Sequence, residues 1–340
     1  MQKRKNSIDL IKFIMAMVVI AIHTQPLVNC TDFRINSIYN TVTAMAVPFF
    51  FIVSGYLLAK KCAFPYSSQD ISKMMTYLKK IVKMYLIWTV IYTPIAIWHY
   101  ISNQDTISYA ILAYIRGLVF VGEHYNSYPL WYLLSTIYAL IMIMILIKHG
   151  ITPKGLLIFS FVMSIVAFGL NYVVNYEGTS IATLTYFQNF IKYTIGNGRI
   201  FNGAIYIPIG MYLANRKILK YQNWLLFTIC FVCNCFITDR TISSYLTVFT
   251  MIGFFGIIES IDLKDNKIYP FLADLSTNMY LLHMYIWSFY YRIVYGGKCY
   301  GVDSFIVTLL FTIVISVMYV IIKYRIAEAR NNRYNYLYTK

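Results

Sequence analysis

Long runs of apolar residues, broken by short polar stretches, recur along the whole chain. A transmembrane helix needs about 20 mostly apolar residues, and the polar breaks separate ten runs of about that length. The ten runs are residues 8–28, 41–59, 81–101, 130–147, 155–174, 199–214, 223–237, 241–258, 271–292 and 303–323. Because backbone amides inside a bilayer must be hydrogen-bonded within the chain, each run is predicted to be a helix. The pattern therefore predicts an all-α integral membrane protein, a polytopic bundle of about ten transmembrane helices.

One further apolar stretch, residues 106–121, is short and contains Arg116. We expect it to lie along the outer surface of the membrane instead of crossing it. If it crossed, the orientation of every later helix would be inverted.

The distribution of basic residues decides between these two topologies. Lys and Arg accumulate in cytoplasmic loops. With ten crossings and a cytoplasmic N-terminus, only seven of the 29 basic residues face outward. These are Arg34, Arg116, Lys192, Arg199, Arg240, Arg292 and Lys298. The asymmetry predicts both termini inside, loops at Lys61 and Lys217 inside, and loops at Glu123 and Glu177 outside.

Composition supports the same class. Hydrophobic residues make up 59% of the 340 positions and charged residues 12%, with a mean hydropathy of +0.60, whereas soluble domains carry roughly a quarter charged residues. No polar stretch is long enough to form a soluble domain. We expect one transmembrane domain over residues 1–325 and a short basic cytoplasmic tail over 326–340. The net charge of +16 is then explained by basic inner loops that face anionic lipid, and not by nucleic acid.

The six cysteines indicate no metal site. Cys230, Cys233 and Cys235 fall within one apolar run and lack further ligands, which favours packed thiols over zinc. Cys30 and Cys299 both fall on the predicted outer side, where a disulfide can form, although the pattern does not favour one.

Ionisable side chains in apolar segments cost several kcal/mol, so each is a candidate functional residue. Lys12 and His23 lie 11 residues apart in the first run. At about 100° per residue they share one helix face, about 20° apart and about 16 Å along the axis. Lys12 could equally be a lysine that extends to the inner interface. For His23 we favour function over a structural hydrogen bond, because imidazole can accept a proton from a hydroxyl near neutral pH.

Two further observations concern the histidines. No other ionisable residue lies between Lys12 and His23, so we expect an isolated imidazole on this helix. His283 lies in the middle of the ninth run, where a structural hydrogen bond and a role in the site are equally plausible.

Six segments carry a family resemblance. In chain order they are residues 7–23, 49–57, 77–85, 130–133, 199–210 and 275–283. Their order and spacing resemble the acyltransferase 3 family of integral membrane O-acyltransferases over nearly the whole chain, although no single segment is specific. That family opens with Asp, Arg and, after ten residues, His, and Asp9, Lys12 and His23 stand at this spacing.

The resemblance implies an enzyme that moves an acyl group, acetyl being expected, from cytoplasmic acyl-CoA to a hydroxyl of an extracytoplasmic cell-envelope glycan. It implies a bacterial cell membrane location and no bound cofactor, with acyl-CoA as the donor substrate. The roles it suggests are donor-phosphate binding for Lys12, Lys80 and Lys83, general base or transient acyl carrier for His23, close helix approach for Ser54 and Gly55, and shaping of the site for Trp131, Arg199, Asn202 and His283.

The chain departs from the family pattern at several of these positions. Lys12, Lys80 and Lys83 stand where arginine is usual, and Pro129 stands where many members have His. Lysine keeps the positive charge but lacks the two-pronged geometry with which arginine holds phosphate.

A second resemblance leaves an alternative function open. Residues 22–27 are similar to the membrane half of the vancomycin-resistance serine racemases, which belongs to the same family and is followed there by a soluble racemase domain. No such domain follows here before Lys340. The alternative is therefore a non-catalytic transporter or recruitment module for a small polar substrate such as serine.

Overall fold

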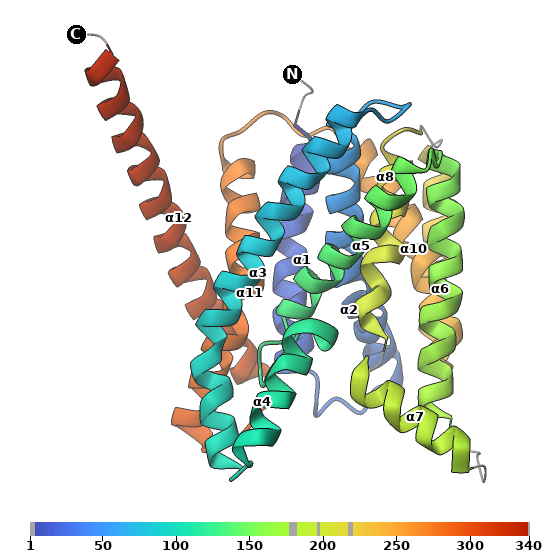
Figure 1. Cartoon of the computed structure of the whole chain (residues 1–340), viewed down its shortest axis with the longest axis vertical. Helices are drawn as coiled ribbons and strands as arrows, with labels where there is room; N and C mark the ends of the chain where they lie inside the picture. Colours follow the sequence, from blue (N-terminus) through green and yellow to red (C-terminus); the bar gives the residue numbers. More distant parts are fainter. Residues whose placement is uncertain (1–3, 177–181, 196–197, 217–219, 339–340) are drawn as a thin grey trace. The chain divides into compact units, whose positions relative to one another are not determined.

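The computed structural model describes residues 4–176, 182–195, 198–216 and 220–338, and every regular element in these ranges is helical (Figure 1). Lys3, Glu177 and Lys217 lie outside the described residues. The chain forms two compact units, one of residues 1–31 and 262–340 (unit 1) and one of residues 32–261 (unit 2). The predicted all-helical architecture is confirmed.

Unit 1 joins the two ends of the chain. Helix α1 (Asn6–Thr24) packs along α11 (Ile268–Tyr295), and α11 packs against α12 (Val302–Tyr338). The loop between α11 and α12 is fastened to α1, since the amide of Gly301 donates to the carbonyl of Thr24 at 2.9 Å. The buried Trp287 indole also donates to the hydroxyl of Ser304 at 3.0 Å. Helix α12 continues through the predicted tail as far as Tyr338.

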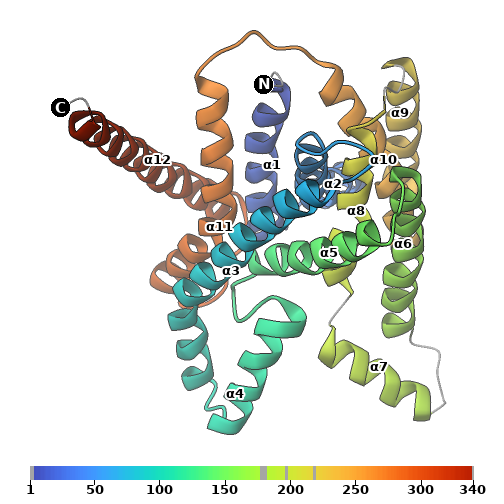
Figure 2. The same cartoon turned by 45° about the horizontal axis from the view of Figure 1, so that its top comes forward.

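Unit 2 contains the remaining helices. They are α2 (Phe33–Ala59), α3 (Ser68–Ser102), α4 (Ile107–Arg116), the π-helical turn η1 (Gly117–Val121), α5 (Leu130–Lys148), α6 (Pro153–Asn175), α7 (Ala182–Thr194), the 3-10 turn η2 (Arg199–Phe201), α8 (Asn202–Leu213), α9 (Lys220–Phe236) and α10 (Arg240–Ser260). Helix α8 packs against α2, α5 and α6, α9 packs against α10, and α3 packs against α5 (Figure 2).

Polar side chains fix where several of these helices begin. Asp32 caps α2 and Asp239 caps α10, each by accepting two backbone amide hydrogens. Ser67 and Asp70 form a reciprocal capping box at the start of α3. Because each cap satisfies amides that have no partner within the helix, these boundaries follow from local sequence.

Seven helices have the length and hydropathy of a membrane span: α1, α2, α3, α5, α6, α10 and α12 through Ala329. All seven coincide with predicted runs. Of the other three predicted runs, α8 and α9 have only 12 and 17 residues, and α11 has 28 residues but is not among the helices with the hydropathy of a span. The count of ten crossings and the positions of the termini stay predictions. Residues 107–121, predicted not to cross, form a short apolar helical segment.

Candidate functional site

Helix α1 carries Lys12 and His23 on one continuous helix, as predicted. The helix is unbroken between them, so the spacing of about 20° and about 16 Å holds. It ends at Thr24, four residues before the predicted boundary, because Gln25 adopts the left-handed conformation that terminates it. His23 is therefore half-buried in the last helical turn, whereas Lys12 is half-buried in the first half of the helix.

His23 is not isolated, which corrects the expectation from its own helix. Its ring centroid lies 5.3 Å from that of His283 on α11, with 34° between the ring planes. The two residues are 260 positions apart in the sequence, and the packing of α1 against α11 brings them together. The sequence offered no signal for this pairing beyond the presence of each histidine in an apolar run.

The hydrogen bonding of His283 defines its tautomer. The side chain is fully buried, and Nδ1 lies 3.1 Å from the carbonyl oxygen of Met279. A carbonyl only accepts, so Nδ1 carries the hydrogen and Nε2 carries the lone pair in the neutral ring. Nε2 is buried without a hydrogen-bond partner among the described residues. The pair therefore holds a buried nitrogen lone pair next to the His23 ring, which is suited to accepting a proton.

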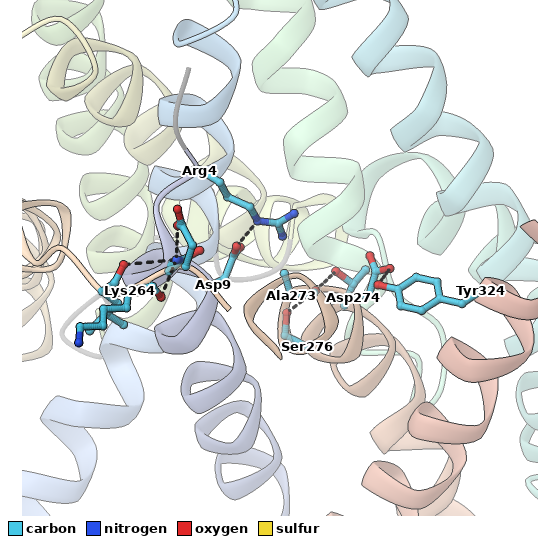
Figure 3. A network of polar contacts seen from close by, with 11 residues as sticks. Arg4, Asp9, Lys264, Ala273, Asp274, Ser276 and Tyr324 are labelled. Atoms are coloured by element: carbon cyan, nitrogen blue, oxygen red, sulfur yellow. Dashed lines mark hydrogen bonds and ion pairs between the residues drawn. The ribbon is translucent and has the colours of Figure 1, made fainter. Parts of the chain in front are cut away.

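A polar network fastens the start of α1 to the rest of unit 1 (Figure 3). The buried carboxylate of Asp9 pairs with Arg4, and the Asn6 side chain donates to the carbonyl of Lys264 at 3.2 Å. Asp274 on α11 pairs with Lys323 at 2.8 Å and accepts from Tyr324 at 3.1 Å. Asp9 stood out in the sequence only as a family motif residue, and the structure gives it a local ion pair with Arg4 at the start of the helix that carries Lys12 and His23.

Lys80 and Lys83 lie one turn apart on α3 in unit 2, and both are exposed. The neighbouring Lys79 is exposed too, whereas Lys73 is paired with Asp70 at 2.8 Å. The three exposed lysines form a basic segment within α3, which begins at Ser68, and exposed ammonium groups can bind anions such as phosphate.

Ser54 and Gly55 on α2 have different surroundings. The hydroxyl of Ser54 lies 3.0 Å from that of Tyr132 on α5, a polar pair that our sequence analysis did not identify. A Cβ at Gly55 would overlap the carbonyl oxygen of Ile207 on α8, and a Cβ at Gly210 on α8 would overlap that of Ile52 on α2. Gly55 therefore permits backbone-to-backbone packing of α2 and α8, as small residues do in membrane helices.

Trp131 and Arg199, predicted to shape the outer side, are brought together. The guanidinium of Arg199 lies 5.4 Å from the centroid of the buried Trp131 ring and pairs with Glu123. Glu123 was missed because it lies in an irregular loop. Asn202, half-buried, begins α8 directly after the turn that carries Arg199.

The loop after η1 also contains a histidine that the sequence analysis did not single out. His124 is buried and stacks on Tyr114 with ring centroids 4.1 Å apart. Burial, together with the positive charge of Arg116, lowers the pKa of His124 to about 4. It is thus neutral at physiological pH, and its close stacking fits a structural role.

The predicted site residues therefore fall into two sets. Unit 1 holds Lys12, His23 and His283, and unit 2 holds Lys80, Lys83, Ser54, Gly55, Trp131, Arg199 and Asn202. The structure brings together His23 with His283 and Trp131 with Arg199. Lys80 and Lys83 are on the exposed side of α3.

Comparison with known proteins gives one family. Residues 5–323 match the family described as "Acyltransferase domain". A protein of Enterococcus faecalis named "Amino-acid racemase" is 31% identical over 215 residues, which is 62% of this chain and 28% of that protein. A "Serine/alanine racemase" of Enterococcus gallinarum is 29% identical over 146 residues, 43% of this chain and 20% of that protein. The chain thus spans less than a third of these relatives. No solved structure matches it.

Proposed function

This chain belongs to the acyltransferase 3 family of membrane proteins, and from that premise we propose that it is a bacterial cell-membrane O-acyltransferase. It transfers an acyl group, in the simplest case acetyl, from cytoplasmic acyl-CoA to a hydroxyl of an extracytoplasmic cell-envelope glycan. The observation that carries this proposal is the His23–His283 pair, in which His283 holds a buried nitrogen lone pair.

The chemistry requires one proton acceptor. His23 removes the proton from the acceptor hydroxyl while its oxygen attacks the thioester carbonyl. The carbon–sulfur bond breaks, and the departing thiolate of CoA takes the proton from the imidazolium. The products are the ester and free CoA thiol, so atoms and charge balance. In a variant of this scheme, less favoured, His23 carries the acyl group transiently before the hydroxyl attacks.

The remaining residues are assigned to binding. Lys12, Lys80 and Lys83 bind the donor phosphates, because exposed or half-exposed ammonium groups complement them at the inner face. Trp131, Arg199 and Asn202 shape the acceptor side, where the guanidinium over an indole ring offers both charge and a flat apolar surface. Ser54 and Gly55 allow the close approach of α2 to α5 and α8.

The names of the relatives favour one alternative. Two are called amino-acid racemases and one a serine/alanine racemase, and this chain corresponds to only part of each. A membrane part of such a protein could admit or recruit a small polar substrate such as serine without using an acyl donor.

One experiment separates the two functions. Purified protein in detergent is given acetyl-CoA, and the release of free thiol is followed with and without a cell-envelope glycan fraction; vesicles that contain the protein are given labelled serine. Glycan-dependent thiol release supports acyl transfer. Serine accumulation without thiol release would contradict it and support transport.

A further inference from the structure

A polar pocket opens in unit 2 where α2 begins, α9 ends and α10 begins. These three helices pack together. Its volume is about 480 Å³, within the range of roughly 300–1,000 Å³ found for small-molecule sites. Three asparagines line it, Asn36 and Asn40 from α2 and Asn234 from α9, together with hydroxyl groups such as Ser243 and with Arg240 from α10. Such a lining offers hydrogen-bond donors and acceptors to a ligand.

Asn234, in one wall of the pocket, has a side-chain oxygen that lacks a hydrogen-bond partner among the described residues. The side chain is only 4% exposed, and its Nδ2 donates to the hydroxyl oxygen of Thr247 at 3.1 Å. That hydroxyl donates its own hydrogen to the carbonyl of Ser243 at 2.8 Å, so it cannot also donate to the Asn234 side chain. The amide orientation is thereby fixed, and Oδ1 remains buried without a hydrogen-bond partner among the described residues.

A buried acceptor that lacks a hydrogen-bond partner carries an uncompensated desolvation cost. A ligand that supplies a hydroxyl or amide hydrogen at this wall would recover that cost. The pocket is therefore suited to a ligand that donates hydrogen bonds. A purely apolar lipid chain has no such donor.

Arg240 is the charged side chain among the residues that line the pocket. Arg240 is exposed at its rim, and no acidic residue is among the lining residues. The nearest acids in sequence, Asp32 and Asp239, are used as helix caps, and each accepts two backbone amides at 2.7–3.1 Å. One guanidinium matches a carboxylate in charge and in geometry, whereas a phosphate monoester carries about −1.5 to −2 charges.

We propose that this pocket binds a hydroxyl-rich ring that bears one carboxylate, a sugar acid of the uronic acid class, as the unit of the acceptor glycan that the protein holds. The role as acceptor subsite rests on the proposed function and its topology, in which α2 begins on the extracytoplasmic side. The carboxylate pairs with Arg240, and a ring hydroxyl donates to Oδ1 of Asn234.

The test measures binding, not transfer. Equilibrium dialysis of the purified full chain compares labelled D-glucuronate with D-glucose, glucose 6-phosphate and L-serine. We expect saturable glucuronate binding that is at least about tenfold tighter than binding of the other three. Arg240→Gln, a change at an exposed position, is expected to weaken glucuronate binding at least about tenfold, and Asn234→Leu to weaken it to a similar extent.

Arg34→Gln is the matched control, since Arg34 is exposed in the first turn of α2 and does not line the pocket. Equal binding of glucose, preference for serine or glucose 6-phosphate, or an unchanged Arg240→Gln variant would overturn the proposal. Acetyl-CoA cleavage is measured on the same samples. Intact cleavage without glucuronate binding refutes only this pocket, whereas glucuronate binding without any cleavage refutes only the proposed transfer.

Discussion

The histidine pair of unit 1 and the lysine pair of unit 2 occupy opposite environments. His283 is fully buried, and its ring lies 5.3 Å from that of His23 on a second helix. Lys80 and Lys83 are exposed on one turn of a single helix. All four are ionisable residues in or next to apolar runs, so sequence alone gives them similar prominence.

The difference in burial suits the two pairs to different functions, proton transfer and phosphate binding. Imidazole accepts a proton when the ring is neutral. A buried ring also has a fixed orientation, so its nitrogen lone pair points in one direction. Phosphate binding by surface ammonium groups depends on long-range attraction, which salt screens over about 10 Å at 0.1 M. We therefore expect substitutions at the histidines to change turnover and substitutions at the lysines to change donor affinity in a salt-dependent way.

The largest effect is expected at His23. His23→Ala should reduce transfer by at least about 100-fold, since general base catalysis contributes about 10²–10⁴-fold. Binding of acyl-CoA and the yield of membrane-inserted protein should stay unchanged, because the donor phosphates are assigned to lysines. Transfer is measured as glycan-dependent thiol release, and binding by dialysis.

His149→Ala is the control for this change, since His149 is exposed at the end of α5. It should be nearly silent, as should His99→Ala, in which the lost ring stacks on Tyr125. Near-normal transfer by the His23→Ala protein would remove His23 from the mechanism and favour the transport function.

A smaller effect is expected at His283, which we regard as a positioning residue for His23. His283→Asn keeps a donor for the carbonyl of Met279 but removes the lone pair at Nε2. We expect kcat to fall about tenfold while the KM for acyl-CoA stays unchanged. If the His283→Asn protein has full kcat and only His283→Ala loses stability, the residue serves packing alone.

The contrast also shows what the sequence could predict. Seven predicted runs became helices of spanning length, because apolar run length and backbone hydrogen bonding determine such helices almost alone. The early end of α1 was missed because it depends on the backbone conformation of Gln25. The short length of α8 was missed because apolar composition does not reveal that the first three residues of the predicted run, 199–201, form the separate turn η2.

Candidate site residues were predicted singly, and their partners were not. His23 and His283 each stood out in an apolar run, yet their contact depends on the packing of helices that are far apart in sequence. The same holds for Glu123 beside Arg199 and for Tyr132 beside Ser54. The pocket at Asn234 could not be predicted, because polar residues at the ends of three separate helices do not reveal which helices face each other.

For the lysine pair we expect a moderate effect on binding. Lys80→Ala combined with Lys83→Ala should weaken acyl-CoA binding about tenfold at low salt, and Lys148→Ala less than about twofold. All three lysines are exposed, but only the first two match the basic motif of the family. The difference should shrink as salt rises, because screening weakens surface charge interactions. Equal effects of both changes at moderate salt would show that general surface charge binds the donor.

The smallest effect tests whether Gly55 belongs to the site or to the scaffold. In Gly55→Ala the added Cβ overlaps the carbonyl of Ile207, so α2 and α8 must separate. Overpacking of this kind costs about 1–3 kcal/mol, and the midpoint of thermal unfolding in detergent should fall. Gly169→Ala on α6 is the matched control, since nothing lies within 4 Å of the new Cβ. Alanine there should raise stability slightly, by about 0.4–1 kcal/mol.

The remaining folded Gly55→Ala protein should bind acyl-CoA normally, because the lysines lie on a different helix. Loss of turnover or donor affinity at unchanged thermal stability would instead place Gly55 in the reaction site.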